Sequence, residues 1–255
     1  MKYAQLIFSP TGGTKKVADA ITGKWDKNVE TVDLTDASAD FIKLQMQKGD
    51  LVLIAVPSYG GRVPDLAVKR LAQVQGGGTC CVLVCVYGNR AYEDTLIELY
   101  DAAQKSGFYT LAAVAAIAEH SIIHQYAANR PDQQDIEKLH DISAKILARF
   151  RDNPTGETEI KIPGSRPYRK SGGVGLAPKA KKNCVECGLC AANCPAQAIS
   201  RTALRSADPE KCISCMRCVV QCPHSARGVN ELMVSAAALA LKKACSVRKE
   251  CELFL

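Results

Sequence analysis

The sequence has few aromatic residues and no long apolar segment. Phe, Trp and Tyr account for 5% of its 255 residues, too few for a surface that binds single-stranded nucleic acid by stacking bases. No apolar run approaches the roughly 20 residues that a bilayer-spanning helix needs. Residues 2–8 lack the layout of a signal peptide. We therefore expect a cytoplasmic protein that neither spans a membrane nor binds nucleic acid.

Motifs for nucleotide binding and hydrolysis are missing as well. The chain contains neither the P-loop pattern G-x4-G-K-S/T nor the dinucleotide pattern G-x-G-x-x-G. The signatures of metalloproteases and of Ser-His-Asp hydrolases are also absent. These absences disfavour NTP binding and hydrolysis.

Cysteine, in contrast, is abundant and unevenly placed. Three of the 13 cysteines precede residue 150 and the other ten follow residue 183. In a reducing cytosol they cannot be a disulfide framework. Charge divides in a similar way: residues 1–150 carry 16 Lys or Arg and 17 Asp or Glu, whereas residues 151–255 carry 17 and 9. The sequence therefore predicts two domains of different chemistry.

The first domain is predicted to alternate strands and helices. Five apolar runs, at 2–8, 29–34, 51–56, 80–86 and 111–118, predict strands, and the segments near 17–21, 38–47, 64–74 and 91–106 predict helices. Pro131 marks the start of a further helix. Uniformly apolar strands joined by helices are typical of an α/β fold, here a doubly wound five-stranded parallel sheet covered on both faces.

Three loops of unusual composition follow strands at the carboxyl edge of this sheet, where such folds bind ligands. The loop 9–14 combines glycines and hydroxyls without a lysine, which suits a single phosphate ester at a helix N-terminus. The loops 57–64 and 87–94 each place a tyrosine beside a glycine, so two aromatic faces could sandwich a flat ring. One such loop alone is better explained by turn-forming and packing residues. Three at one edge favour a binding site.

The motif S-x-T-G-x-T after the first strand resembles the phosphate loop of flavodoxins, and the order of elements is similar over residues 1–152. The resemblance implies non-covalent FMN, with its phosphate held by Ser9, Thr11, Gly12, Gly13 and Thr14. It also implies that the isoalloxazine lies between the other two loops, which contribute Pro57, Ser58, Tyr59, Gly60, Tyr87, Gly88, Asn89, Arg90 and Tyr92. Arg62 and Arg90 depart from the acidic surroundings typical of free flavodoxins, and positive charge there would favour reduced, anionic flavin.

Other residues of the first half have weaker signals. His120 and His124 follow the fifth strand and could approach the flavin, although a lone histidine is more often a surface or packing residue. The cysteines at 80, 81 and 85 are expected to be buried as small hydrophobic residues. Residues 153–178 predict a basic linker, since seven Lys or Arg and no acid stand between 161 and 182. This segment is either a solvated tether or a docking strip for an acidic redox partner.

Two cysteine runs of identical spacing dominate the second half. They are Cys184-x2-Cys187-x2-Cys190-x3-Cys194-Pro195 and Cys212-x2-Cys215-x2-Cys218-x3-Cys222-Pro223. This is the bacterial ferredoxin spacing, in which the fourth cysteine of each run binds the other cluster. Cluster I is therefore expected at Cys184, Cys187, Cys190 and Cys222, and cluster II at Cys194, Cys212, Cys215 and Cys218. Structural zinc is the rival, but it uses two C-x2-C pairs rather than two runs of four ending in Cys-Pro.

Residues 179–228 resemble a two-cluster bacterial ferredoxin, including Ile199 and the internal repeat. The resemblance implies a small α+β ferredoxin-like domain of two short hairpins and two small helices around its clusters. The tail, 229–255, predicts a helix followed by an apolar end that docks on one of the domains. Cys245 and Cys251 match neither run; they are structural or, if exposed near a cluster, redox-active.

The chain as a whole resembles a group of fusion proteins that join an N-terminal flavodoxin domain to a C-terminal two-cluster ferredoxin. Further matches are Tyr-Gly-Asn-Arg-Ala-Tyr, Glu-His-Ser and the closing Arg-Lys-Glu-x-Glu-Leu-Phe-Leu. The resemblance implies the architecture, with two 4Fe-4S clusters and FMN, more than a reaction. Since FMN accepts two electrons and each cluster passes one at a time, the leading hypothesis is an electron-transfer flavo-iron–sulfur protein that relays electrons between them. We expect an electron carrier, with no catalytic residues, that works with a ferredoxin-type donor or acceptor protein.

Two other functions stay open. Reduced FMN could transfer hydride to a small organic substrate above Tyr59 or Tyr87, with a proton from His120 or His124. Alternatively, the first domain has lost FMN and the clusters act as a sensor or scaffold, which the intact loop at 9–14 argues against. The sequence also leaves open whether flavin and cluster meet within one molecule or across a homodimer.

Overall fold

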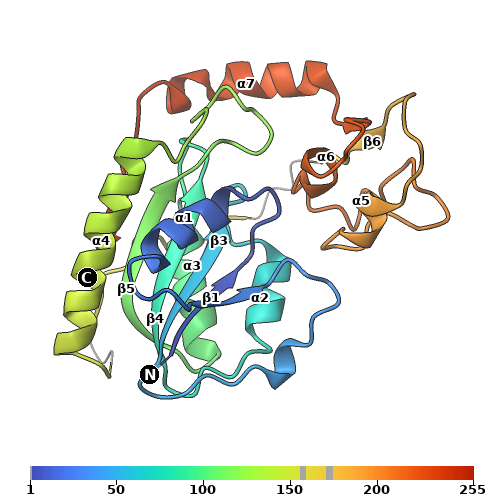
Figure 1. Ribbon diagram of the computed structural model, residues 1–255. Coiled ribbons are helices and arrows are strands. Elements are labelled where there is room, and N and C mark those ends of the chain that lie inside the picture. Colours follow the sequence, from blue (N-terminus) through green and yellow to red (C-terminus); the bar gives the residue numbers. More distant parts are fainter. Residues whose placement is uncertain (1, 156–158, 171–174) are drawn as a thin grey trace.

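The computed structural model describes residues 2–155, 159–170 and 175–255. Figure 1 shows a larger domain built on a sheet and a smaller, cysteine-rich domain beside it, with helix α7 (Glu231–Cys245) running from the smaller domain back to the larger. Within the described ranges, no helix is both long and apolar enough to cross a membrane.

Six strands form the main sheet in the described part of the chain, in the order β2-β1-β3-β4-β5-β8. They are β1 (Tyr3–Ile7), β2 (Glu30–Asp33), β3 (Leu51–Pro57), β4 (Cys80–Tyr87), β5 (Tyr109–Ile117) and β8 (Glu252–Phe254). Strands β1 to β5 are parallel, and 2-1-3-4-5 is the flavodoxin-like order. The predicted five-stranded parallel sheet is confirmed.

The sixth strand comes from the tail. Residues 252–254 pair antiparallel with residues 113–115 of β5, and Leu253 and Phe254 pack against the main core. The apolar end therefore docks on the first domain, as expected, and it does so by covering the free edge of the sheet.

Helices cover both faces of the sheet (Figure 1). On one face, α1 (Gly13–Thr22) contacts α4 (Gln133–Asp152), and on the other α2 (Asp65–Leu71) contacts α3 (Thr95–Lys105). The Ser143 hydroxyl of α4 donates to the Ile21 carbonyl of α1 at 2.8 Å. Because both faces are covered, the central strands β3 and β4 are buried almost throughout, which explains their uniformly apolar sequence.

The prediction of a helix near 38–47 is wrong: only a single 3-10 turn, η1 (Phe41–Lys43), forms there. Beyond it, the Met46 amide donates to the Gln75 carbonyl at 2.9 Å, and the Gln75 amide donates to the Leu44 carbonyl at 3.1 Å. These bonds hold the backbone extended beside the segment that follows α2, so a non-local pairing replaces the local helix.

The cysteine-rich domain has two four-residue helices, α5 (Leu189–Ala192) and α6 (Arg217–Val220). Its described residues contain one two-stranded sheet, in which β6 (Lys179–Ala180) pairs antiparallel with β7 (Arg227–Gly228). This sheet joins the two ends of the domain, so the two expected hairpins are not found in the described chain. Single hydrogen bonds, such as the one from the Asp208 amide to the Ala198 carbonyl at 2.7 Å, replace the strand pairing that was expected within each hairpin.

The segment predicted as a linker, 153–178, is tied to the first domain; its residues 156–158 and 171–174 lie outside the described ranges. The Asp94 carboxylate accepts hydrogen bonds from the amides of Ser165 at 2.9 Å and Arg169 at 2.7 Å. The Arg169 guanidinium pairs with Glu93. The described part is therefore a strap along the start of α3 rather than a solvated tether.

Candidate cofactor sites

A cleft of about 450 Å³ lies at the carboxyl edge of the sheet. Loops that follow β1, β3, β4 and β5 contribute its walls, as the doubly wound fold predicts. The lining includes Pro10, Thr11, Gly13, Thr14, Pro57, Ser58, Tyr59, Gly60, Arg62, Tyr87, Gly88 and residues 118–122. Most residues predicted to hold a flavin thus meet in one space.

The first loop is shaped to receive an anion. Gly12 precedes α1 with a φ of 92°, a conformation that favours glycine. The Ser9 hydroxyl accepts from the Lys15 amide at 3.0 Å, which shapes the loop. Ser9 does not line the cleft. Within the described chain the Gly13 and Thr14 amides have no protein partner. Free amides at a helix start, beside two threonine hydroxyls, fit a phosphate.

The two tyrosines predicted to flank the ring differ in exposure. Tyr59 is half-buried and sits in a turn closed by two backbone hydrogen bonds with Arg62, of 2.9 and 3.2 Å. Gly60 and Gly61 allow this turn with φ values of 61° and 84°. Tyr87 is buried in the core. The cleft therefore offers mainly the ring of Tyr59, and Tyr87 supports its opposite wall.

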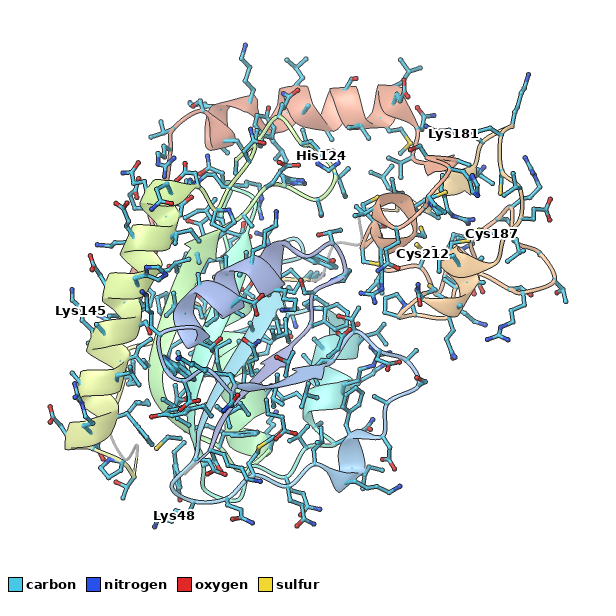
Figure 2. The ribbon with its side chains drawn as sticks, viewed as in Figure 1. Lys48, His124, Lys145, Lys181, Cys187 and Cys212 are labelled. Atoms are coloured by element: carbon cyan, nitrogen blue, oxygen red, sulfur yellow. The ribbon has the colours of Figure 1, made fainter. Side chains whose placement is uncertain are left out.

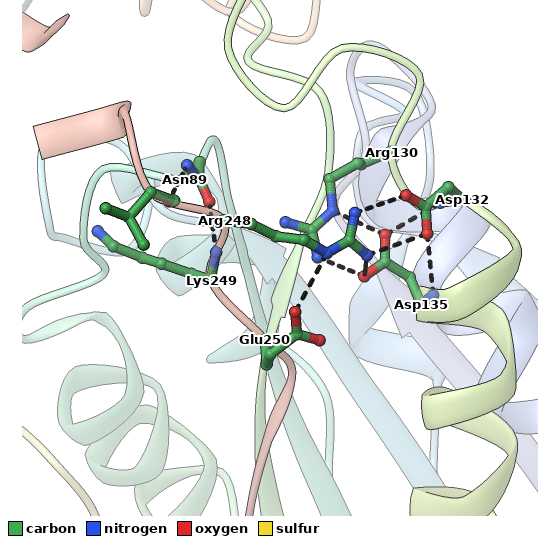
Figure 3. Close-up of polar contacts among 8 residues, drawn as sticks. Asn89, Arg130, Asp132, Asp135, Arg248, Lys249 and Glu250 are labelled. Carbon is green, nitrogen blue, oxygen red and sulfur yellow. Dashed lines mark hydrogen bonds and ion pairs between the residues drawn. The ribbon is translucent and has the colours of Figure 1, made fainter.

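The rest of the third loop serves the tail instead of the cleft, which corrects the prediction for these residues. The Asn89 amide group donates to the carbonyls of Cys245 at 3.0 Å and Val247 at 2.9 Å, and its oxygen accepts from the tail (Figure 3). The Tyr92 hydroxyl donates to Glu252 of β8 at 2.8 Å. Neither the Asn89 nor the Tyr92 side chain lines the cleft, because both find their hydrogen-bond partners in the returning tail.

Positive charge near the cleft is balanced. The Arg62 guanidinium forms a bidentate pair with Glu98, with both bonds at 2.7 Å, which raises the pKa of Arg62. Arg90 pairs with Glu93 at 2.7 Å and is not part of the lining. The expected positive charge beside a flavin is therefore smaller than the sequence alone indicates.

The loop after β5 brings one histidine into the cleft. The His120 Nδ1 accepts from the amides of Ile122 at 3.2 Å and Ile123 at 3.1 Å, so the neutral ring carries its proton on Nε2. Burial, followed by the nearby His124, lowers the pKa of His120. His124 is exposed, pairs with Glu119 at 2.7 Å and does not line the cleft.

Two small cavities lie in the cysteine-rich domain, and each is bordered by one predicted ligand set. One is lined by Cys184, Cys187, Cys190 and Cys222, and the other by Cys194, Cys212, Cys215 and Cys218. Each run thus lends its fourth cysteine to the other cavity. Four sulfurs around a cavity fit a cluster with one ligand per corner, and within the described ranges no three His, Cys, Asp or Glu converge on a single metal ion.

The backbone around the cavities repeats in the two halves of the domain. The Ala198 amide donates to Cys194 Sγ and the Ala226 amide donates to Cys222 Sγ, both at 3.3 Å. Buried Arg227 also lines the first cavity, with Nη1 3.5 Å from Cys190 Sγ. No sequence signal distinguished this arginine from its neighbours.

Residues 183–226 match the model of the 4Fe-4S dicluster domain family. The cysteine-rich domain is a 4Fe-4S dicluster domain. The family match supports iron–sulfur clusters as cofactors of this domain. The fusion of the domain to a flavodoxin-like sheet domain matches the predicted architecture. No curated protein sequence matches the chain.

Solved structures similar to the first domain include flavodoxins. One from Streptococcus pneumoniae is 21% identical, with a TM-score of 0.38, and the match covers 58% of this chain and 99% of that one. A flavodoxin from the domain Archaea is 13% identical, with a TM-score of 0.43 and coverage of 59% and 99%. Megasphaera elsdenii flavodoxin is 16% identical, with a TM-score of 0.38 and coverage of 56% and 98%. The flavodoxin-like fold rests on the strand order, since these scores are low.

The dicluster domain closes one side of the cleft. Cys212 and Ile213 line both the cleft and the cavity of the cluster II cysteines. Burial, and then the nearby Cys215, raise the pKa of Tyr59 well above its usual range. Figure 2 shows Cys212 on the side of the domain that faces the sheet and Cys187 on the far side. The cluster II cavity is therefore next to the cleft, and the cluster I cavity lies outward.

The five remaining cysteines, Cys80, Cys81, Cys85, Cys245 and Cys251, are all buried and lie outside both cavities. The first three are in β4, as expected. Burial raises the pKa of Cys251 to about 11 and also raises the pKa of Cys245. Buried thiols with raised pKa values are packing residues rather than reactive groups.

Proposed function

We propose that the chain is an electron-transfer protein that relays electrons between two 4Fe-4S clusters and FMN. The observation that supports this most is the double role of Cys212 and Ile213, which border both the cleft and the cluster II cavity. One shared wall would keep the two redox centres close within a single chain. When bound, FMN exchanges electrons singly or in pairs, whereas each cluster exchanges one at a time.

The residues divide this work as follows. The amides of Gly13 and Thr14 and the hydroxyls of Thr11 and Thr14 would hold the FMN phosphate, with Ser9 shaping their loop. Tyr59 and the loop around it would cover the ring. Cluster I would be held by Cys184, Cys187, Cys190 and Cys222, and cluster II by Cys194, Cys212, Cys215 and Cys218. The first domain would comprise residues 1–152 together with the tail strand β8.

Anaerobic purification followed by assay of iron, sulfide and released flavin tests this composition. About eight irons and one FMN per chain are expected. Eight irons with no flavin, and none taken up when FMN is added, would contradict the relay and favour a sensor or scaffold with a silent flavodoxin-like fold.

A second candidate is the reduction of a small organic substrate by FMN, and His120 favours it. Its Nε2–H is directed away from the two amides that hold Nδ1, and the residue lines the cleft. This group could donate to a carbonyl or carboxylate of a substrate. Anaerobic reoxidation of reduced protein by candidate carbonyl compounds tests this function; if His120→Gln reoxidises at the wild-type rate, His120 has no such role.

A further inference from the structure

The outer side of the dicluster domain carries an apolar centre at the cluster I cavity. Val185 and Leu189, which line that cavity, are 61% and 39% exposed. Cys187, between them in the sequence, is also exposed. An exposed apolar group beside the cavity of a proposed redox centre is a candidate contact surface.

Three positive residues lie near this centre. Lys181 and Lys182 precede the first cysteine and are exposed, and Figure 2 shows Lys181 at the upper edge of the domain, near the start of α7. The Arg205 guanidinium donates to the Lys181 carbonyl at 2.9 Å. Glu186 is the only acid between residues 179 and 207. It pairs with Arg205 at 3.4 Å, so the two lysines have no acidic counterpart nearby in the sequence.

We infer that this surface, made of Lys181, Lys182, Val185, Cys187, Leu189 and Arg205 and called here the cluster I face, is the docking site of a small acidic electron-transfer protein. The inference rests on the proposed relay, in which electrons must enter or leave at the centre farther from the flavin. One electron crosses the face per encounter: the donor centre is oxidised by one electron and the acceptor centre is reduced by one. No bond forms or breaks and no proton moves.

The arrangement explains why the partner should be acidic. Positive charge at the rim attracts an acidic protein over several ångströms and orients it. The apolar centre then excludes water and allows the two redox centres to approach closely. Arg166 and Arg169 of the strap are paired with acids of the first domain, whereas the cluster I face places the exposed Lys181 and Lys182 close in sequence to the first cluster I cysteine.

A double charge-reversal variant tests the cluster I face, and a double variant on α7 with the same change in net charge is the control. The probe is an acidic plant-type [2Fe–2S] ferredoxin, reduced beforehand and freed of reductant, and stopped-flow absorbance follows electron transfer to the holoprotein. We expect Lys181→Glu/Lys182→Glu to slow the reaction by about tenfold or more at low ionic strength and to flatten its salt dependence. Lys242→Glu/Lys243→Glu changes the net charge equally and should alter the rate by less than about twofold.

The apolar centre is tested in the same assay. Val185→Asp should slow transfer, whereas Val247→Asp, at an exposed valine in the tail, should not. Iron and flavin content show whether each variant is folded and loaded. Equal slowing by both lysine pairs, or no slowing by either, would overturn the inference. Absence of FMN would overturn the relay alone, because reduction of the clusters through the cluster I face would still be measurable.

Discussion

The Arg70 guanidinium donates a hydrogen bond of 2.7 Å to the carbonyl of Pro195, across the contact between the two domains. Its other arm donates to the Leu34 carbonyl at 2.6 Å, and the side chain is buried. Pro195 directly follows Cys194, a predicted ligand of cluster II. One arginine therefore joins the end of β2 to the cluster II side of the dicluster domain.

Replacing Arg70 with Gln should loosen this contact. The shorter side chain cannot reach both carbonyls, and each lost charge-assisted hydrogen bond costs about 1.5 to 3 kcal/mol. Hydrogen–deuterium exchange of peptides covering residues 194–200 should become faster than in the wild type. Arg151→Gln, at an exposed position near the end of α4, is the control. Unchanged exchange at 194–200 in the Arg70 variant would show that other contacts hold the domains.

The loop at 9–14 is expected to hold the FMN phosphate without affecting the clusters. Thr11→Ala combined with Thr14→Ala removes two hydroxyl donors, which should weaken FMN binding by about tenfold or more. Quenching of flavin fluorescence measures the affinity, and iron analysis should stay at the wild-type value. Ser235→Ala, on an exposed part of α7, should change neither. If the threonine variant loses iron but retains flavin, the assignment of the two sites is wrong.

The two cysteine sets should be separable. Cys187→Ser removes one proposed ligand of cluster I, and Cys215→Ser removes one proposed ligand of cluster II. Each variant should change one of two cluster signals in the electron paramagnetic resonance spectrum of the reduced protein and lower the iron content toward about half. Cys245→Ser should leave both signals intact. Equal loss of both signals in each variant would mean that the clusters assemble only as one unit.

Acid should destabilise the first domain through His120. Its pKa is lowered by burial and by the neighbouring His124 and Arg90, so below about pH 6.5 the unfolded chain binds a proton that the folded chain resists. Stability from this group is present above that pH and is lost as the pH falls. Protonation of Nδ1 would also break its bonds to the amides of Ile122 and Ile123.

The fluorescence of Trp25, the single tryptophan of the chain and buried in the first domain, reports this effect. Urea midpoints between pH 8 and 5.5 should fall less in His120→Gln than in the wild type. His140→Gln is the control and should follow the wild type. Identical pH dependence in all three proteins would remove His120 as the cause.

Local patterns in the sequence were enough to predict much of the fold. The five parallel strands follow from uniformly apolar runs, and the open turn that leads into α1 follows from the glycines after the first strand. Ferredoxin spacing predicts that Cys194 and Cys222 are exchanged between the runs, and each of them lines the cavity of the other run's first three cysteines. Each of these signals lies within a few consecutive residues.

Contacts between distant residues could not be predicted in the same way. Asn89 and Tyr92 look like residues of a cofactor loop until the tail returns to β5 and binds both. Strand β8 has three residues, too short for a recognisable alternating pattern. Arg70 is one arginine among many, and only the folded chain brings it to Pro195.

The proposed relay requires flavin and clusters to exchange electrons within one chain. Pulsed one-electron reduction of the anaerobic holoprotein, followed by absorbance of flavin and clusters at several protein concentrations, measures this exchange. Because the centres share the wall formed by Cys212 and Ile213, redistribution of electrons should be first order, with a rate independent of protein concentration. A rate that rises in proportion to concentration, or no redistribution at all, would rule out electron transfer between flavin and clusters within one chain.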